Sequence, residues 1–192
     1  RWTACATPPR KRFPTATFTA PKGRNTERES DTGSSRQAVN YWLFKTEPDV
    51  YGIADLAAEP GKPVRWDGIR NYQARNYLRD RVAAGDPVFI YHAGCRIPGV
   101  AGIAEVAQAV YADPGQFDSE NSGYDARSDP KAPRWYCVDV LHRRTFAPLI
   151  PAERLKTLPE LANMVLFRQG RLSVQPVTEE EWHTIVDLAD NS

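Results

Sequence analysis

The pattern of apolar and polar positions divides the chain from residue 41 onward into short predicted elements. Tyr41–Lys45 is an aromatic and apolar run of strand length, and Trp135–Phe146 alternates as a longer strand. Further strands are predicted at 64–66, 86–92, 99–110 and 172–174. Helical spacing predicts helices at 51–58, 71–82 and 178–188, and one or two short helical turns within 151–161. The helix at 178–188 opens with the capping sequence Thr178-Glu179-Glu180-Glu181.

The predicted order of strands and helices does not alternate regularly. Three strands between residues 86 and 146 have no helix between them, and the short link 95–98 suggests a hairpin. Residues 112–132 are polar with scattered Gly and Pro, and are expected to form a long loop. The sequence therefore predicts an α+β fold, with helices flanking a curved mixed sheet or small barrel.

Residues 1–39 differ from the rest of the chain in composition and charge. They are rich in Pro, Thr, Ser, Arg and Lys, and their few apolar residues follow no period. Eight basic and three acidic residues give them a net charge of +5, so that residues 40–192 carry −4 of the total of +1. We expect a disordered tail or upstream extension, or an arm that adds weak affinity for nucleic acid. One domain is predicted to follow, at 40–192.

The composition also narrows the class of protein. Cys5, Cys95 and Cys137 are far apart and lack CxxC spacing, which fits a reducing compartment better than a disulfide scaffold. No apolar run approaches the roughly 18 residues of a membrane span, and residues 1–9 lack the apolar core of a secretory signal. We expect an intracellular monomer without metal or cofactor, cytoplasmic in a bacterium and nuclear in a eukaryote.

Arginine, aromatic and amide residues are interleaved between Arg65 and Arg79, where Asp67 is the one acidic residue. Arginines bind phosphates, aromatic faces stack on bases, and amides read base edges. Arg75 and Arg79 share a helix face, although surface ion pairs with nearby aspartates would explain these arginines equally well. The run is therefore a candidate nucleic-acid interface.

The tryptophans divide into two groups by their surroundings. Trp42 and Trp182 lie among apolar residues and are predicted to be in the core. Trp66 ends a strand just before a turn, where side chains are often exposed, and Trp135 opens another strand. If a curved sheet brings Trp66 and Trp135 together, they could sandwich a planar ligand, and each stacked base contributes about 1–3 kcal/mol.

An enzymatic function remains an alternative. His92 lies three residues before Cys95, but a Cys–His pair needs hydrogen-bond contact and an orienting third group. Glu105 and Asp139 could form a pair of carboxylates, although nothing in the sequence places them together. The alternatives to a non-enzymatic binder are thus an enzyme that uses His92 on a nucleic acid or nucleotide, and a module for small molecules or proteins.

Six blocks in order carry a resemblance to a known family: Tyr41–Pro48, Trp66–Asn76, Phe89–His92, Pro98–Gly102, Trp135–Val140 and Asn163–Pro176. Together they resemble the EVE domain family. The resemblance implies a PUA-like fold, related to the YTH readers of methylated adenine in RNA. It also implies that the partner is DNA or RNA carrying a modified base. The modified base would be extruded from its strand into an aromatic pocket and would not be altered chemically.

The resemblance also implies site residues, and Trp66 would be a stacking wall of the pocket. The residues expected to form the base pocket are Lys45, Thr46, Trp66, Asp67, Asn71, Tyr91, His92, Ala93 and Trp135. The residues expected to meet phosphates are Arg70, Arg75 and Arg171. Relatives often carry Ser at the position of Ala93, so one polar contact to the base is expected to be missing.

Overall fold

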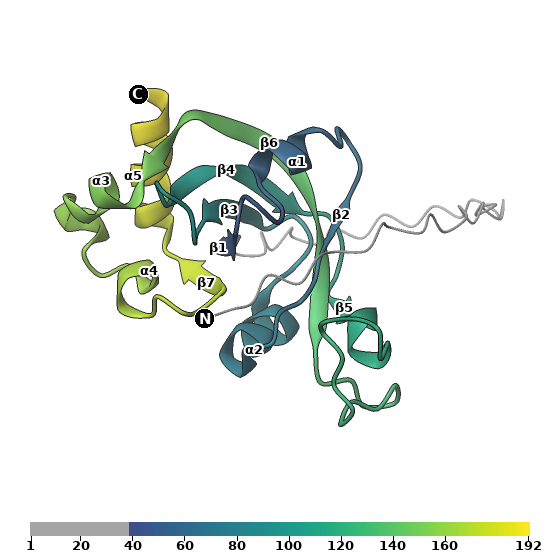
Figure 1. The fold of residues 1–192 in the computed structure, drawn as a ribbon. Helices are drawn as coiled ribbons and strands as arrows, with labels where there is room; N and C mark the ends of the chain where they lie inside the picture. The colour runs from purple at the N-terminus through teal and green to yellow at the C-terminus, as the bar shows by residue number, and fades with distance from the viewer. Residues whose placement is uncertain (1–38) are drawn as a thin grey trace, which may run out of the picture. The chain divides into compact units, whose positions relative to one another are not determined.

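A curled mixed sheet is the frame of residues 39–192, the part of the chain that the computed structural model describes (Figure 1). The strands are β1 (Tyr41–Thr46), β2 (Val64–Trp66), β3 (Pro87–His92), β4 (Gly99–Val106), β5 (Tyr111–Ala112), β6 (Tyr136–Pro151) and β7 (Val174–Val177). They lie in the order β2-β6-β4-β3-β1-β7, and β5 pairs with β6. Only the β1–β3 pairing within this described sheet is parallel. The predicted curved mixed sheet is confirmed.

Five α-helices of the described chain flank this sheet: α1 (Ile53–Ala57), α2 (Tyr72–Arg81), α3 (Ala152–Lys156), α4 (Val165–Arg168) and α5 (Glu179–Asp190). α2 begins at Asn71, whose side chain accepts hydrogen bonds from the amides of Gln73 and Ala74. α5 begins with the predicted capping box between Thr178 and Glu181. The predicted tail at 1–39 lies, apart from Val39, outside the described residues.

β6 is longer than the sequence predicts. The prolines at 148 and 151 suggest a linker after Phe146, but the strand continues to Pro151. It continues because Val100 and Gly99 of β4 pair with Ile150 and Pro151 after an irregularity in the register. The predicted linker is therefore wrong, and β6 joins β2, β4 and β5 over most of its length.

The two central strands β1 and β3 bury a hydrophobic cluster on each of their faces. On what we call the α2 side, Phe44 and Ile90 pack with Trp66 and with Leu78 of α2. On the α5 side, Leu43, Phe89 and Tyr91 pack with residues of α3, α4 and α5, which lie together on that side in Figure 1. Successive strand residues point to opposite faces, which explains why these strands are apolar throughout.

The tryptophans predicted to be in the core are confirmed there. Trp42 is fully buried on the α2 side, and its indole nitrogen donates to Asp86 Oδ2 at 2.9 Å. Trp182 of α5 stacks on Phe89 with ring centroids 3.9 Å apart. The Trp42 ring therefore links β1 to the residue just before β3, and the Trp182 ring links α5 to β3.

Candidate nucleic-acid interface

The ends of β1 and β3 lie side by side, but consecutive residues there point to opposite sides of the sheet. Lys45 pairs in register with Tyr91, and Thr46 with His92. Lys45 lies on the α5 side, with its ammonium group 5.4 Å from the centroid of the Tyr91 ring. His92 lies on the α2 side, where it contacts Ile53. The strand pleat thus places Lys45 and Tyr91 on one side of the sheet and Thr46 and His92 on the other, and a base pocket that all four residues share stays a prediction.

Neither Trp66 nor Trp135 is open to solvent. Trp66 is 7% exposed and packs against Phe44 and Tyr51, with ring centroids 5.9 and 6.4 Å away. Trp135 is 4% exposed, and its ring lies 5.0 Å from that of Tyr72. The predicted exposure of Trp66 is therefore wrong, and both rings pack against other protein rings; the sandwich of a planar ligand between them stays a prediction. The curl of the sheet turns Trp66 inward; its contact with a base stays a prediction.

Three further residues of the predicted base pocket hold the fold together. The hydroxyl of Thr46 donates to the Tyr51 carbonyl at 2.6 Å. Nε2 of His92 accepts from the Ile53 amide at 3.0 Å, and burial lowers the pKa of His92, which keeps its ring neutral. The Asn71 side chain caps α2. These bonds explain the three residues without a ligand, and their base contacts stay predictions.

The residues of the enzymatic alternative bond to other partners rather than to one another. The thiol of Cys95 donates to the carbonyl of Ile97 at 3.4 Å, whereas the ring of His92 faces Ile53. Glu105 accepts from Arg143 at 2.8 Å, and Asp139 accepts from the Tyr111 hydroxyl at 2.5 Å. In the part of the chain that is described, no cluster of His, Cys, Asp and Glu could hold a metal ion, and no helix is long and apolar enough to span a membrane.

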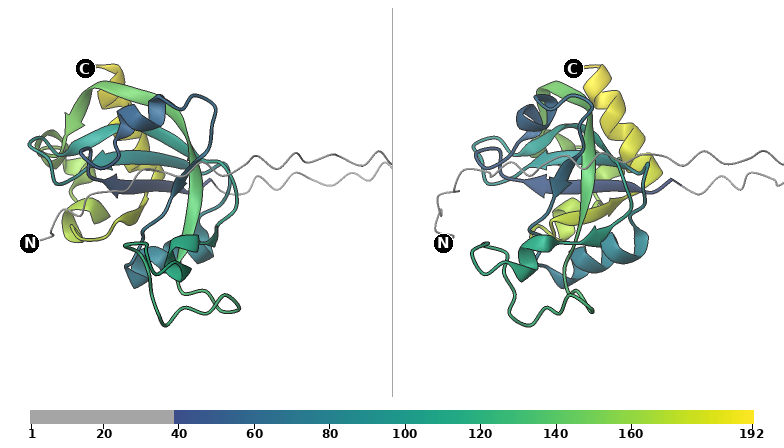
Figure 2. Two further views of the ribbon diagram at one scale, coloured as in Figure 1. Left: turned by 45° about the vertical axis from the view of Figure 1, so that its right-hand side comes forward. Right: turned by 90° about the vertical axis from the view of Figure 1, so that its right-hand side faces the viewer.

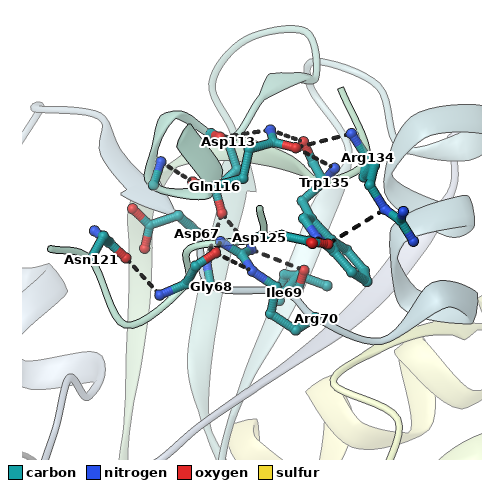
Figure 3. A network of polar contacts seen from close by, with 12 residues as sticks. Asp67, Gly68, Ile69, Arg70, Asp113, Gln116, Asn121, Asp125, Arg134 and Trp135 are labelled. Atoms are coloured by element: carbon teal, nitrogen blue, oxygen red, sulfur yellow. Dashed lines mark hydrogen bonds and ion pairs between the residues drawn. The ribbon is translucent and has the colours of Figure 1, made fainter. Parts of the chain in front are cut away.

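Arg70 joins the turn after β2 to the segment that follows β5 (Figure 3). Its Nη1 donates to Asp113 Oδ2 at 2.7 Å, and its Nε donates to the Gly123 carbonyl at 2.9 Å. Nη2 bonds to the same carbonyl, so all three guanidinium nitrogens are engaged. Asp113 is 1% exposed and also accepts from the Gly68 amide. The structure thus gives Arg70 the role of a clamp, and its phosphate contact stays a prediction.

Beside this clamp, guanidinium groups and aromatic rings are layered on one another. The Arg70 guanidinium lies 5.6 Å from the Trp135 ring centroid, and Trp135 in turn contacts Tyr72. Arg75 and Arg134 lie 4.9 and 5.9 Å from the Tyr72 ring. We call these five residues the arginine–aromatic ladder. Stacking of this kind keeps charge and planar surface close together.

Tyr72 and Arg134 are functional candidates that the sequence reasoning missed. Tyr72 is 48% exposed, and Arg134 donates to its hydroxyl. Figure 2 shows the segment after β5, which carries Arg134, next to α2 in both views. Tyr72 lies inside the interleaved run, and Arg134 directly precedes Trp135. Their residue types and positions could therefore have indicated a role in binding nucleic acid. Their contact across 62 residues was not visible in the sequence.

Asp125 contacts two members of the ladder, Trp135 and Arg134. The Trp135 indole donates to Asp125 Oδ2 at 2.9 Å, and this bond, with others from Arg127, lowers the pKa of Asp125 to about 2. The ionised carboxylate lies 3.4 Å from Nε of Arg134. It therefore fixes both Trp135 and Arg134 in place at neutral pH.

Of the other arginines, Arg75 and Arg171 remain available to a ligand. Arg75 bonds to the Asn76 side chain at 2.7 Å and forms no ion pair with any described residue. Arg171 is exposed between α4 and β7. Arg79 instead bonds to Asp80 at 2.6 Å, as the surface ion-pair alternative predicts. The phosphate contacts of Arg75 and Arg171 stay predictions that the geometry allows.

Comparison with known proteins places this architecture among its relatives. Residues 40–188 match the model of the EVE domain. Thymocyte nuclear protein 1 of Mus musculus is 40% identical over 168 residues, which are 79% of this chain and 74% of the relative. A crystal structure of a Pseudomonas putida protein is 45% identical, with a TM-score of 0.74, over 78% of this chain and 99% of that one.

A third relative has been crystallised with a ligand. It is the human THYN1 protein in complex with DNA that contains 5-methylcytosine. Its chain is 39% identical, with a TM-score of 0.75, over 80% of this chain and 99% of its own. The predicted PUA-like fold is confirmed by these structures, and the chain belongs to the EVE domain family.

Proposed function

We propose that this protein binds a modified nucleobase in DNA or RNA without changing it chemically. The observation that carries the proposal is the arginine–aromatic ladder, which presents the exposed ring of Tyr72 with the cations Arg75 and Arg134. Figure 3 shows two other members, Arg70 and Trp135, near Gly68 in the turn after β2. The crystallised complex of human THYN1 with DNA containing 5-methylcytosine supports the same class of ligand.

The ladder is suited to hold the strand that carries the base. The exposed part of Tyr72, whose ring already contacts Arg75 and Arg134, would offer aromatic surface to a neighbouring base, and Arg75 would offer guanidinium donors to a phosphate. Arg171 is the second candidate for a phosphate contact. Residues 40–192 carry a net charge of −4, so this attraction is local and overall affinity is modest.

The base itself would be read at the turn after β2. The side chain of Asp67 is 49% exposed and directly follows Trp66. A carboxylate accepts hydrogen bonds, so it suits the exocyclic amino group of cytosine or adenine. A methyl group buried against apolar surface adds about 0.8 kcal/mol, which gives a preference rather than absolute selectivity.

The test is binding of short oligonucleotides that contain 5-methylcytosine, N6-methyladenine or no modification, measured by fluorescence anisotropy. We expect wild-type protein to bind one modified form more tightly, and Asp67→Ala to reduce that preference. Tyr72→Ala should weaken all forms alike, by about tenfold, since it removes one stacked base. Lys62→Ala, on an exposed loop, is the matched control. Equal binding of modified and unmodified oligonucleotides by the wild type would overturn the proposal.

The names of the relatives support a nuclear location if the source is a eukaryote. The enzymatic alternative lacks an assembled group of catalytic residues in residues 39–192, since His92 and Cys95 bond elsewhere. A binding function therefore accounts for more of the geometry than a catalytic one.

A further inference from the structure

A pocket of about 390 Å³ opens on the α5 side, where β1 and β3 end. Lys45 and Tyr91 line it from the strands, Lys156 from α3, and Leu166 and Phe167 from α4. Its volume is at the lower end of the range of about 300–1,000 Å³ that small-molecule sites occupy. It is separate from the arginine–aromatic ladder, which lies around α2.

Two lysines face this pocket without an ion-pair partner among residues 39–192, and the Glu47 side chain packs beside Gly94 at its rim. The Lys45 ammonium donates to the Gly170 carbonyl at 2.9 Å, and the Lys156 ammonium lies 5.9 Å from the Phe167 ring. Neither forms an ion pair with a residue in the described range 39–192, and no described Asp or Glu lines the pocket. Burial lowers the pKa of Lys45, which shows that its charge is partly desolvated. A bound anion would offset that desolvation.

The remaining walls suit a planar ring. Phe167 supplies aromatic surface, and the largely buried Tyr91 and Leu166, together with Pro98, supply apolar contacts. Nucleotides combine a flat ring with a phosphate, and aromatic and cationic side chains are the groups that bind these two parts. The pocket thus offers both recognition elements within one volume of suitable size.

We propose that this pocket binds a nucleoside monophosphate, either free or as the terminal nucleotide of a nucleic acid. Its phosphate would contact Lys45 and Lys156, and its base would lie against Phe167. The site goes beyond the proposed reading of a modified base, because it lies on the α5 side of β1 and uses neither Asp67 nor the arginine–aromatic ladder, although Lys45 and Tyr91 were expected in the base pocket.

Isothermal titration calorimetry on the full chain tests this site, with AMP, GMP, CMP and UMP as probes. We expect saturable binding of at least one of them, and binding of the matching nucleoside and of inorganic phosphate that is at least about tenfold weaker. Lys156→Ala should weaken nucleotide binding about tenfold, since it removes a charged contact. Arg154→Ala, which changes another exposed cation on the same helix, should bind as the wild type does.

Absence of saturable binding by all four nucleotides would overturn the proposal. So would equal binding by Lys156→Ala and wild type, or phosphate binding as tight as that of the nucleotides. Competition by an oligonucleotide with a terminal phosphate, but not by one with a terminal hydroxyl, would identify a strand end as the source. Competition by neither would identify the free nucleotide.

A second variant separates this site from the proposed base reader. Tyr72→Ala should leave nucleotide binding unchanged while it weakens oligonucleotide binding. If the oligonucleotide measurements fail and the calorimetry succeeds, only the proposed base reading is overturned; the reverse result overturns only the lysine pocket.

Discussion

The imidazole of His92 accepts a hydrogen bond from the amide of Ile53, and this contact fixes the start of α1 against the end of β3. Only a ring with an unprotonated Nε2 can accept this bond. Burial lowers the pKa of His92, while the charge of nearby Asp55 acts in the opposite direction to a smaller extent. Folding is therefore coupled to the loss of a proton from this residue.

We predict that the free energy of unfolding falls as the pH drops below about 6.5, the ordinary pKa of histidine. In that range the unfolded chain binds a proton at His92 and the folded chain does not, so protonation favours unfolding. The loss should level off below the lowered pKa of the folded state. Urea unfolding between about pH 5 and 8 measures this dependence.

His92→Gln is the matching variant, because the glutamine oxygen can accept the same bond without titrating. It should lose this part of the pH dependence, whereas His142→Gln should keep it. An identical pH slope for His92→Gln and wild type would contradict the assignment.

Asn71→Ala should lower the free energy of unfolding by about 1 kcal/mol, because it leaves the first amides of α2 without their cap. Asn71→Asp should retain most of the stability, since a carboxylate caps equally well. Urea unfolding of the two variants checks this. A loss of oligonucleotide binding by both variants at unchanged stability would instead favour a direct base contact.

Arg70→Ala should lower the free energy of unfolding by about 1–3 kcal/mol, because it leaves the buried carboxylate of Asp113 without its cation. The segment 113–135 should also become more sensitive to limited proteolysis. Arg79→Ala removes only a surface pair and should change neither measurement. Wild-type protease resistance in Arg70→Ala would show that the clamp does not hold this segment.

Oligonucleotide affinity should fall with salt as expected for about two to four phosphate contacts, each contributing roughly −0.7 to −0.9 to the logarithmic slope. Arg75→Ala should make the slope shallower by about one such contact. The measurement is anisotropy over a series of salt concentrations, with Lys62→Ala as control. An unchanged slope in Arg75→Ala would remove this arginine from the interface.

The fold was largely predictable because its strands and helices carry local signals. The apolar runs of β1 and β3 and the capping box of α5 were visible directly, whereas Asn71, which caps α2, was assigned to the base pocket instead. The continuation of β6 past Pro148 was not, because it depends on pairing with Gly99 and Val100 of β4. α4, with four residues, is too short to show a helical period.

The candidate site was less predictable because its contacts are distant in sequence. The Arg70 guanidinium binds Asp113 and Gly123, which are 43 and 53 residues away. Trp66 is buried by rings from β1 and the following loop, which only the curl of the sheet brings to it. Residue types indicated the candidate interface, but side-chain directions, which the sequence does not show, decide which of its members are exposed.

The opposite orientation of Lys45 and Thr46 has a consequence for how this chain can evolve. A shift of β1 by one residue against β3 would exchange the two sides, moving a lysine into the apolar interior and a threonine into the lysine pocket. An insertion or deletion within residues 41–46 would thus disrupt the packing on both sides of the sheet at once, so we expect such changes to be selected against. A single substitution in β1 changes only the side of the sheet to which its side chain points. The α2 side and the α5 side can therefore diversify independently although they share one strand.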